Sequence, residues 1–245
     1  MRYLKSIKLS KEEFEYIHSD IDEKKDLETA QEKVSWLKLL GYRQTWAFVV
    51  GKFLTDPVWW FYLFWLPSFL DKQYGMSATQ VALPIAVVYT MTTFGSIFGG
   101  WLSGKFISMG WQVYKARKTA MLIFALLVVP VVLAQALGQY SPWFAVIIVG
   151  IAASAHQAWS ANIFTTTSDM FPKKVVSSVT GLGGMAGSVG GILIASLAGI
   201  LLDHYKALGS IETGYYIMFI VCASAYLIAW VIMHFLTPTM KRVEI

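Results

Sequence analysis

A lysine and an aspartate stand four residues apart near the middle of a long apolar run in this chain. The run covers residues 45–70, and about 20 apolar residues are enough to cross a bilayer. Charged side chains inside a membrane face a protein interior or a water-filled path for an ion or a solute. We therefore expect Lys52 to attract an anionic solute, with Asp56 either tuning that attraction or carrying a proton. The alternative is an ion pair between positions i and i+4 that only lowers the cost of burying both charges.

Aromatic side chains accompany these charges on one side of the run. At 100° per residue of helix, Trp59 lies within a sector of about 60° that also contains Lys52 and Asp56, and Trp60 follows directly. Pro57 stands between the charges and the tryptophans. A proline inside a helix removes a hydrogen bond and clashes with the preceding turn, so Pro57 predicts a break there. A broken, charged helix indicates a transporter segment rather than a simple membrane anchor.

A second polar stripe lies on and just after the apolar run at residues 143–168. Its members fall within about 140° of one another around a helix, and they are His156, Trp159, Asn162, Thr166 and Asp169. Amide and hydroxyl groups beside an aromatic platform suit a sugar-like ligand, and His156 adds an imidazole that can take up a proton near neutral pH. The alternative is a set of polar contacts between helices, which are common in membranes. Asp169 is expected to fix a gate or to pair with a basic loop.

The two stripes and their neighbours define the candidate site. The residues expected to bind substrate are Lys52, Asp56, Trp59, Trp60, His156, Gln157, Trp159, Asn162 and Thr166. The residues expected to serve gating or structure are Pro57, Asp169, Pro172, Gly183 and Gly187. The sequence has no metal-ligand spacing, no glycine-rich loop ending in Lys-Ser or Lys-Thr that would bind ATP, and no evident Ser-His-Asp order. We expect no metal, no cofactor and no enzymatic activity.

Composition places these residues in a membrane protein. The chain is 56% hydrophobic and 14% charged, which a soluble domain of this size would not be. Its six apolar runs lie at residues 45–70, 81–103, 119–137, 143–168, 175–202 and 215–236.

Seventeen of the twenty Lys and Arg residues fall in the first 43 residues, the connections after the second and fourth runs, and the tail. Positive charge stays on the cytoplasmic side, so we expect both termini in the cytoplasm of a multi-pass protein, with no role in binding nucleic acid.

The six apolar runs show the same order of three types twice. The first and fourth are polar and contain or precede a proline, the second and fifth are rich in glycine, and the third and sixth are plain and apolar. Three spans invert the second copy, which predicts an all-α fold of six transmembrane helices in a 3+3 inverted repeat, with a site near the midplane. Glycines also let helices pack closely, and packing alone is the alternative role for them. We expect a cytoplasmic segment at 1–43, the helices at 44–237 and a cytoplasmic tail at 238–245.

Four strings of the sequence resemble a known transporter family. They are SWLKLLGYRQTW at 35–46, KFLTDPVWWFY at 52–62, AHQAWSANIFTTTSDMFP at 155–172 and GLGGMAG at 181–187. Together with the rest of the chain they resemble the C-terminal half of a major facilitator superfamily protein of the anion:cation symporter group. Within that group they resemble bacterial hexuronate (glucuronate/galacturonate) permeases.

The resemblance implies proton-coupled uptake of an anionic sugar acid across the bacterial inner membrane, with H⁺ as the coupling ion. Members of the group have twelve spans, so it also implies that this chain is a fragment and that an N-terminal six-helix half is missing. The main carboxylate-binding arginine and the proton-carrying acids are expected in that half. Some relatives place an asparagine where this chain has glycine near Gly184. A truncated, non-transporting membrane remnant and a carrier for another organic anion remain alternatives.

Overall fold

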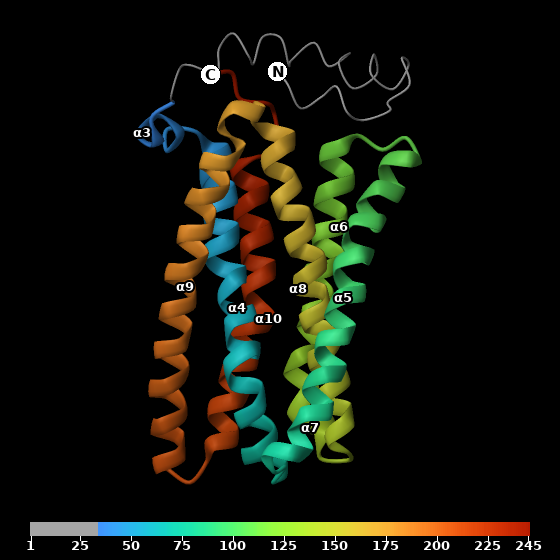
Figure 1. Ribbon diagram of the computed structural model, residues 1–245, viewed down its shortest axis with the longest axis vertical. Helices are drawn as coiled ribbons and strands as arrows, with labels where there is room; N and C mark the ends of the chain where they lie inside the picture. The colour runs from blue at the N-terminus through green and yellow to red at the C-terminus, as the bar shows by residue number, and fades with distance from the viewer. Residues whose placement is uncertain (1–33) are drawn as a thin grey trace, which may run out of the picture.

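Long helices running in alternating directions make up the protein (Figure 1). The computed structural model describes residues 34–245, and within that range it contains helices and no strands. The elements are α3 (Trp36–Leu39), α4 (Arg43–Tyr74), α5 (Ala78–Ser108), α6 (Val113–Val128), the 3₁₀ turn η1 (Val129–Leu133), α7 (Ala134–Gly138), α8 (Pro142–Met170), α9 (Lys173–Ala207) and α10 (Ile211–Leu236). Residues 1–33 lie outside the described range, so most of the expected segment 1–43 is not covered.

Five stretches in this part of the chain are long and apolar enough to cross a membrane. They are Ala78–Ser108, Val113–Gly138, Pro142–Met170, Lys173–Ala207 and Ile211–Leu236. Each contains one of the apolar runs predicted from the sequence. Helix α4 has 32 residues and contains the predicted run 45–70, but it is not among the five. Its charged, proline, tryptophan and tyrosine residues make it less apolar than its neighbours.

Two local expectations are wrong. Helix α4 is continuous from Arg43 to Tyr74 and passes through Pro57 and Pro67 without ending. The carbonyl of Phe53, which Pro57 leaves without its usual helical donor, lies instead against Gly190 of α9. The third run is not a plain helix, because α6 and α7 are separated by the 3₁₀ turn η1, which has a proline in its first turn.

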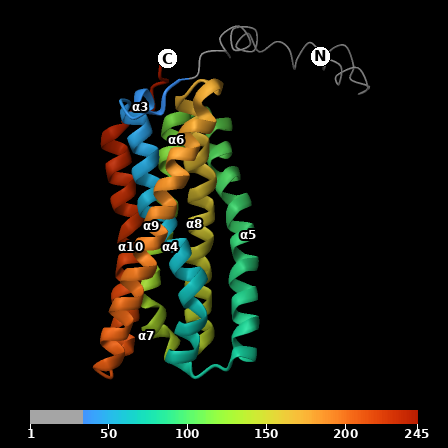
Figure 2. The ribbon, with the colours of Figure 1, turned by 60° about the vertical axis from the view of Figure 1, so that its left-hand side comes forward.

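The packing of the helices brings α4 and α8 together at the centre of the bundle. Helix α4 packs along α9 and α10, and helix α8 packs along α5 and α6. Helices α4 and α8 also contact one another, and α10 contacts α6. In Figure 2, α10 and α5 lie on opposite sides of the bundle, with α4, α8 and α9 between them. The two helices that carry the polar stripes are therefore neighbours.

Glycines set how closely these pairs approach. A Cβ atom added at Gly95 or Gly99 of α5 would overlap the main chain of Ser154 or Ala158 in α8. A Cβ at Gly190 of α9 would lie 2.6 Å from both the Phe53 carbonyl oxygen and Pro57 Cγ of α4. Small residues let helix backbones approach in this way in membranes. The α5–α8 and α9–α4 contacts are thus built by the same means.

Basic residues gather at one end of the bundle. The connection from α5 to α6, the turn from α8 to α9 and the C-terminal tail all lie at the upper end in Figure 1, whereas Lys72 and Lys206 belong to the turns at the lower end. The tail, within the predicted segment 238–245, is fastened at this upper end. Val243 N donates to the Met170 carbonyl at 2.8 Å, and Gln44 Nε2 donates to the Lys241 carbonyl at 3.1 Å.

Candidate functional site

The two charges in α4 form a buried ion pair. Lys52 Nζ lies 2.7 Å from Asp56 Oδ2, and the Lys52 and Asp56 side chains are 6% and 20% exposed. The Lys52 ammonium also lies 4.3 Å from the centre of the Phe164 ring of α8, a cation–π geometry. The ion pair that the sequence analysis gave as the alternative role of Lys52 and Asp56 is therefore present. Because Asp56 keeps part of its surface exposed, the pair is not sealed.

Glycines of α9 make room for this pair. A Cβ atom added at Gly187 would overlap Asp56 Oδ2, and one at Gly183 would overlap the Phe48 ring. Gly191 lies in the same way against Trp60, whose ring stacks on Phe64 with centroids 5.7 Å apart. Any larger residue at Gly187 would displace the carboxylate. The structure thus gives Gly183 and Gly187 a packing role beside the charges.

Next to the ion pair, side chains of three helices form a stack. The Trp59 ring of α4 lies parallel to the His156 ring of α8, with centroids 5.4 Å apart and planes 12° apart. The His156 Nδ1 and the Tyr226 hydroxyl of α10 are 2.5 Å apart, and that hydroxyl lies 3.3 Å from the Thr55 carbonyl oxygen. When Tyr226 donates to Thr55, His156 donates its Nδ1 proton to Tyr226. This network fixes the rotation of the imidazole.

Sequence reasoning missed three contributors to this region. They are Tyr226 of α10, Phe164 of α8 and Tyr89 of α5, whose ring meets the edge of Trp59 with centroids 6.0 Å apart. The sixth run was treated as plain and apolar. The phenol group of Tyr226 in the middle of that run was the available signal, because a buried tyrosine hydroxyl needs a hydrogen-bond partner.

Most of the α8 stripe turns away from the ion pair, so the two predicted stripes do not line one shared face. Asn162 is buried and donates to the Gly99 carbonyl of α5 at 2.8 Å, whereas Lys52 approaches α8 at Phe164, about 160° further around the helix. Thr166 is buried and donates to Ile163 in its own helix at 2.6 Å. The interhelical alternative therefore describes Asn162, because a glycine on α5 allows the close approach that its amide spans.

Two further residues of α8 complete this description. Trp159 is fully buried, packs edge-on against Tyr226 with centroids 5.5 Å apart, and has an indole N–H with no partner. Gln157 is half-buried. Of the nine expected binding residues, the structure brings four together, namely Lys52, Asp56, Trp59 and His156.

Two of the residues expected to serve gating or structure, Asp169 and Pro172, lie at the end of the bundle that carries the basic loops. Arg117 Nε donates to Asp169 Oδ2 at 3.1 Å, and Arg117 Nη1 donates to Ser103 Oγ at 2.9 Å. This cluster ties α5, α6 and α8 together near their ends. Pro172 is the residue that precedes α9, so it separates α8 from α9 at the same end. Asp169 is thus about four turns of helix away from the stack.

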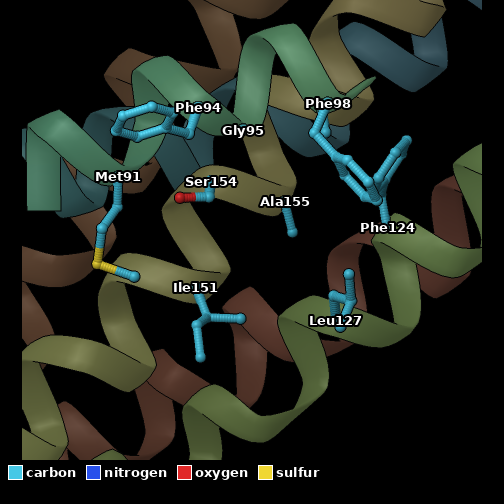
Figure 3. Close-up of a pocket in the computed structure, with 10 residues that line it drawn as sticks. Met91, Phe94, Gly95, Phe98, Phe124, Leu127, Ile151, Ser154 and Ala155 are labelled. Carbon is cyan, nitrogen blue, oxygen red and sulfur yellow. The ribbon is translucent and has the colours of Figure 1, made fainter. Parts of the chain in front are cut away.

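One apolar groove in the described part of the chain is a poor match for a sugar acid. It lies between α5, α6 and α8, has a volume of about 400 Å³, and is lined mainly by apolar side chains such as Met91, Phe94 and Leu127 (Figure 3). Its hydroxyl group, on Ser154, donates to the Gly150 carbonyl of the same helix at 2.7 Å. A sugar carboxylate would find no charged partner there. The chemistry that fits an anion is at Lys52.

Comparison with known proteins shows which family and which transporters this chain is similar to. The family model of the Major Facilitator Superfamily matches residues 8–195. The chain is 29% identical over 197 residues to the hexuronate transporter of Escherichia coli K12. This match covers 80% of this chain and 45% of that protein. The chain is 23% identical over 204 residues to a D-galactonate transporter of E. coli O6:H1, and this match covers 80% of this chain and 46% of that protein. The chain is also 32% identical over 95 residues to a galacturonate transporter of Dickeya chrysanthemi, and this match covers 39% of this chain and 27% of that protein. The chain spans about half the length, or less, of these relatives.

Proposed function

Because the chain belongs to the Major Facilitator Superfamily, we propose that it forms part of a proton-coupled carrier that takes up anionic sugar acids across the bacterial inner membrane. The observation that carries this proposal is the lysine ammonium at the centre of the bundle, paired with one partly exposed carboxylate. A buried positive charge of this kind marks a solute path. The names of the relatives support the substrate class, since they refer to hexuronate, galactonate and galacturonate.

In the proposed site, Lys52 binds the carboxylate of the sugar acid and the stacked Trp59 and His156 rings lie beside the sugar. An ammonium–carboxylate hydrogen bond is stronger than a bond between neutral groups. Aromatic faces suit the apolar side of a sugar ring. The imidazole is held by Tyr226 and so presents a fixed edge. We assign Gln157 and Trp60 to the margin of this site because both keep part of their surface exposed.

We further propose that the six long helices are a 3+3 inverted repeat and that α4 is the sixth membrane span. In such a repeat, α4, α5 and α6 correspond to α8, α9 and α10. The contact between α4 and α9 then corresponds to the contact between α8 and α5, and the contact between α4 and α10 corresponds to the contact between α8 and α6. Both contacts of each kind are present, and glycines of α5 and α9 mediate the first kind in both copies. These correspondences support two copies of one unit. With α4 included, the tail and the basic loops lie on the cytoplasmic side.

Transport in this proposal needs a second six-helix unit, whether it belongs to the same polypeptide or to another chain. Alternating access requires one half to rock against the other around the site. Asp169, bound to Arg117 at the cytoplasmic end, then serves as part of the gate. The matched relatives are about twice as long as the region that this chain matches, which supports the same arrangement.

The uptake of sugar acids by the source organism tests this function. Deletion of the coding sequence should abolish saturable uptake of at least one of D-glucuronate, D-galacturonate and D-galactonate, while uptake of neutral D-glucose stays unchanged. Restoring the coding sequence should restore the lost uptake. Unchanged uptake of all three acids in the deletion strain would reject the proposal.

Orientation in the membrane gives a separate prediction. Single cysteines placed at Lys72 and Lys206 should react with a membrane-impermeant maleimide added from the periplasmic side, and a cysteine at Lys115 should react only after the inner side is opened. The reason is that Lys and Arg accumulate at the cytoplasmic side. The natural Cys222 is buried and serves as the unreactive control. Labelling of position 72 from the inside only would contradict the proposed topology.

A further inference from the structure

We propose that the Lys52–Asp56 pair couples the proton to the solute by exchanging partners. In this exchange the carboxylate of the sugar acid takes Lys52, and Asp56 binds a proton from the adjoining water. When the sugar acid leaves, the proton leaves and the ion pair re-forms. This inference rests on the proposed function and deepens it. It places a proton-binding group within this chain.

The geometry around the ammonium favours such an exchange. Lys52 Nζ is held by Asp56 Oδ2 on one side and faced by the Phe164 ring on another. The Lys52 side chain is only 6% exposed, while Asp56 is 20% exposed. An incoming carboxylate therefore reaches the ammonium past Asp56 and must share Lys52 with it or displace it.

The charges then decide what happens to Asp56. Before binding, the charges of the Lys52 ammonium and the Asp56 carboxylate sum to zero. After an anion has bound, two carboxylates share one ammonium and the site carries a charge of −1. Two carboxylates in one poorly hydrated site do not both stay ionised. One proton on Asp56 restores a sum of zero, so each sugar acid enters with one proton and no bond other than the O–H bond is made or broken.

Among the described residues, Asp56 is the one carboxylate paired with the Lys52 ammonium. Helix α9 meets Asp56 with Gly187, and the remaining titratable groups nearby are His156 of α8, Tyr226 of α10 and, beyond Trp59, Tyr89 of α5. His156 and Tyr226 already bond to one another. Within residues 34–245 the other carboxylates lie near helix ends or in the tail: Asp71, Asp169, Asp203, Glu212 and Glu244.

Infrared difference spectroscopy of the chain in lipid nanodiscs tests the exchange directly. The carbonyl stretch of a protonated carboxylic acid is separate from that of a carboxylate. At neutral pH, saturating D-glucuronate should produce this band in the wild type, and D-glucose should not. The band should be missing in Asp56→Asn, which assigns it. In Lys52→Met it should be present without any ligand, because Asp56 has lost its cation. The matched control is Asp71→Asn, which removes the exposed Lys72–Asp71 pair of the same helix and should leave the band intact.

A second readout uses the linkage between the two ligands. If one proton accompanies each anion, the dissociation constant for D-glucuronate should rise tenfold per pH unit above neutrality in the wild type. In Asp56→Asn it should not change with pH. The inference is overturned if D-glucuronate leaves Asp56 ionised, or if Asp56 stays ionised in Lys52→Met. If either result is found while cells still take up the acid through this protein, the coupling inference fails and the proposed function stands. If the deletion strain loses no uptake, the proposed function fails and the inference fails with it.

Discussion

Gly99→Ala should destabilise the helical bundle by about 2–3 kcal/mol, the upper range for overpacking a well-filled interface. The added methyl group would lie 2.6 Å from the Ala158 carbonyl oxygen and 2.9 Å from its carbonyl carbon. These atoms belong to the main chain of α8 and cannot rotate away, so α5 and α8 have to separate. Separation also lengthens the hydrogen bond from Asn162 to the Gly99 carbonyl. Thermal unfolding in detergent, followed by circular dichroism, measures the change.

The neighbouring glycine supplies the control for this prediction. Gly100→Ala is the same substitution in the same turn of α5, but no atom of a neighbouring helix lies within 4 Å of the added methyl group. Alanine favours a helix over glycine by about 1 kcal/mol in either position, so the difference between the two variants isolates the contact with α8. Equal stability of the two variants would mean that α5 and α8 do not approach as closely as described.

Lys52→Ala should be the most damaging single substitution among the expected binding residues. It leaves the Asp56 carboxylate without its cation in the bundle interior, and removal of one partner of a buried ion pair costs about 3–5 kcal/mol. Because a fifth of the Asp56 side chain is exposed and Asp56 takes up a proton once its cation is removed, we expect the lower end of that range. The yield of folded protein, from size-exclusion chromatography in detergent, and thermal unfolding both report it.

The double variant Lys52→Ala/Asp56→Ala should recover most of this stability, since no charge remains unpaired. The non-additivity of the two single effects measures the coupling between the side chains. Lys72→Ala, with and without Asp71→Ala, is the exposed control pair, in which little change is expected because both side chains are about half exposed. A double variant as unstable as Lys52→Ala would show that the pair does not account for the loss.

The helices could be predicted from the sequence because hydropathy and charge act on whole runs. Each predicted apolar run lies within one helical stretch, and the error at Pro57 was local. Prolines are tolerated inside membrane helices where neighbouring helices accommodate the freed backbone carbonyl. Here Gly190 of α9 comes close enough to cover the carbonyl of Phe53, and that contact joins residues far apart in the sequence.

The site could be predicted only in part, because a polar stripe gives angles within one helix and not the rotation of that helix against its neighbours. The i, i+4 spacing was enough to place Lys52 beside Asp56. The direction of Asn162 depended on Gly99 of α5. Tyr226 was missed because the sequence alone does not say which neighbouring helix a tyrosine in the middle of an apolar run faces.

Uptake per folded molecule by the Lys52→Ala/Asp56→Ala variant tests the account most directly. The variant is produced in the deletion strain, its folded amount is measured, and uptake of D-glucuronate is compared with that of the wild type. Loss of one charge-assisted hydrogen bond to carboxylate, about 1.5–3 kcal/mol, corresponds to a roughly 10- to 150-fold weaker affinity. We predict a loss of at least that size despite restored folding. Full recovery of uptake would contradict it, because the ammonium of Lys52 would then have held only Asp56 and never the substrate.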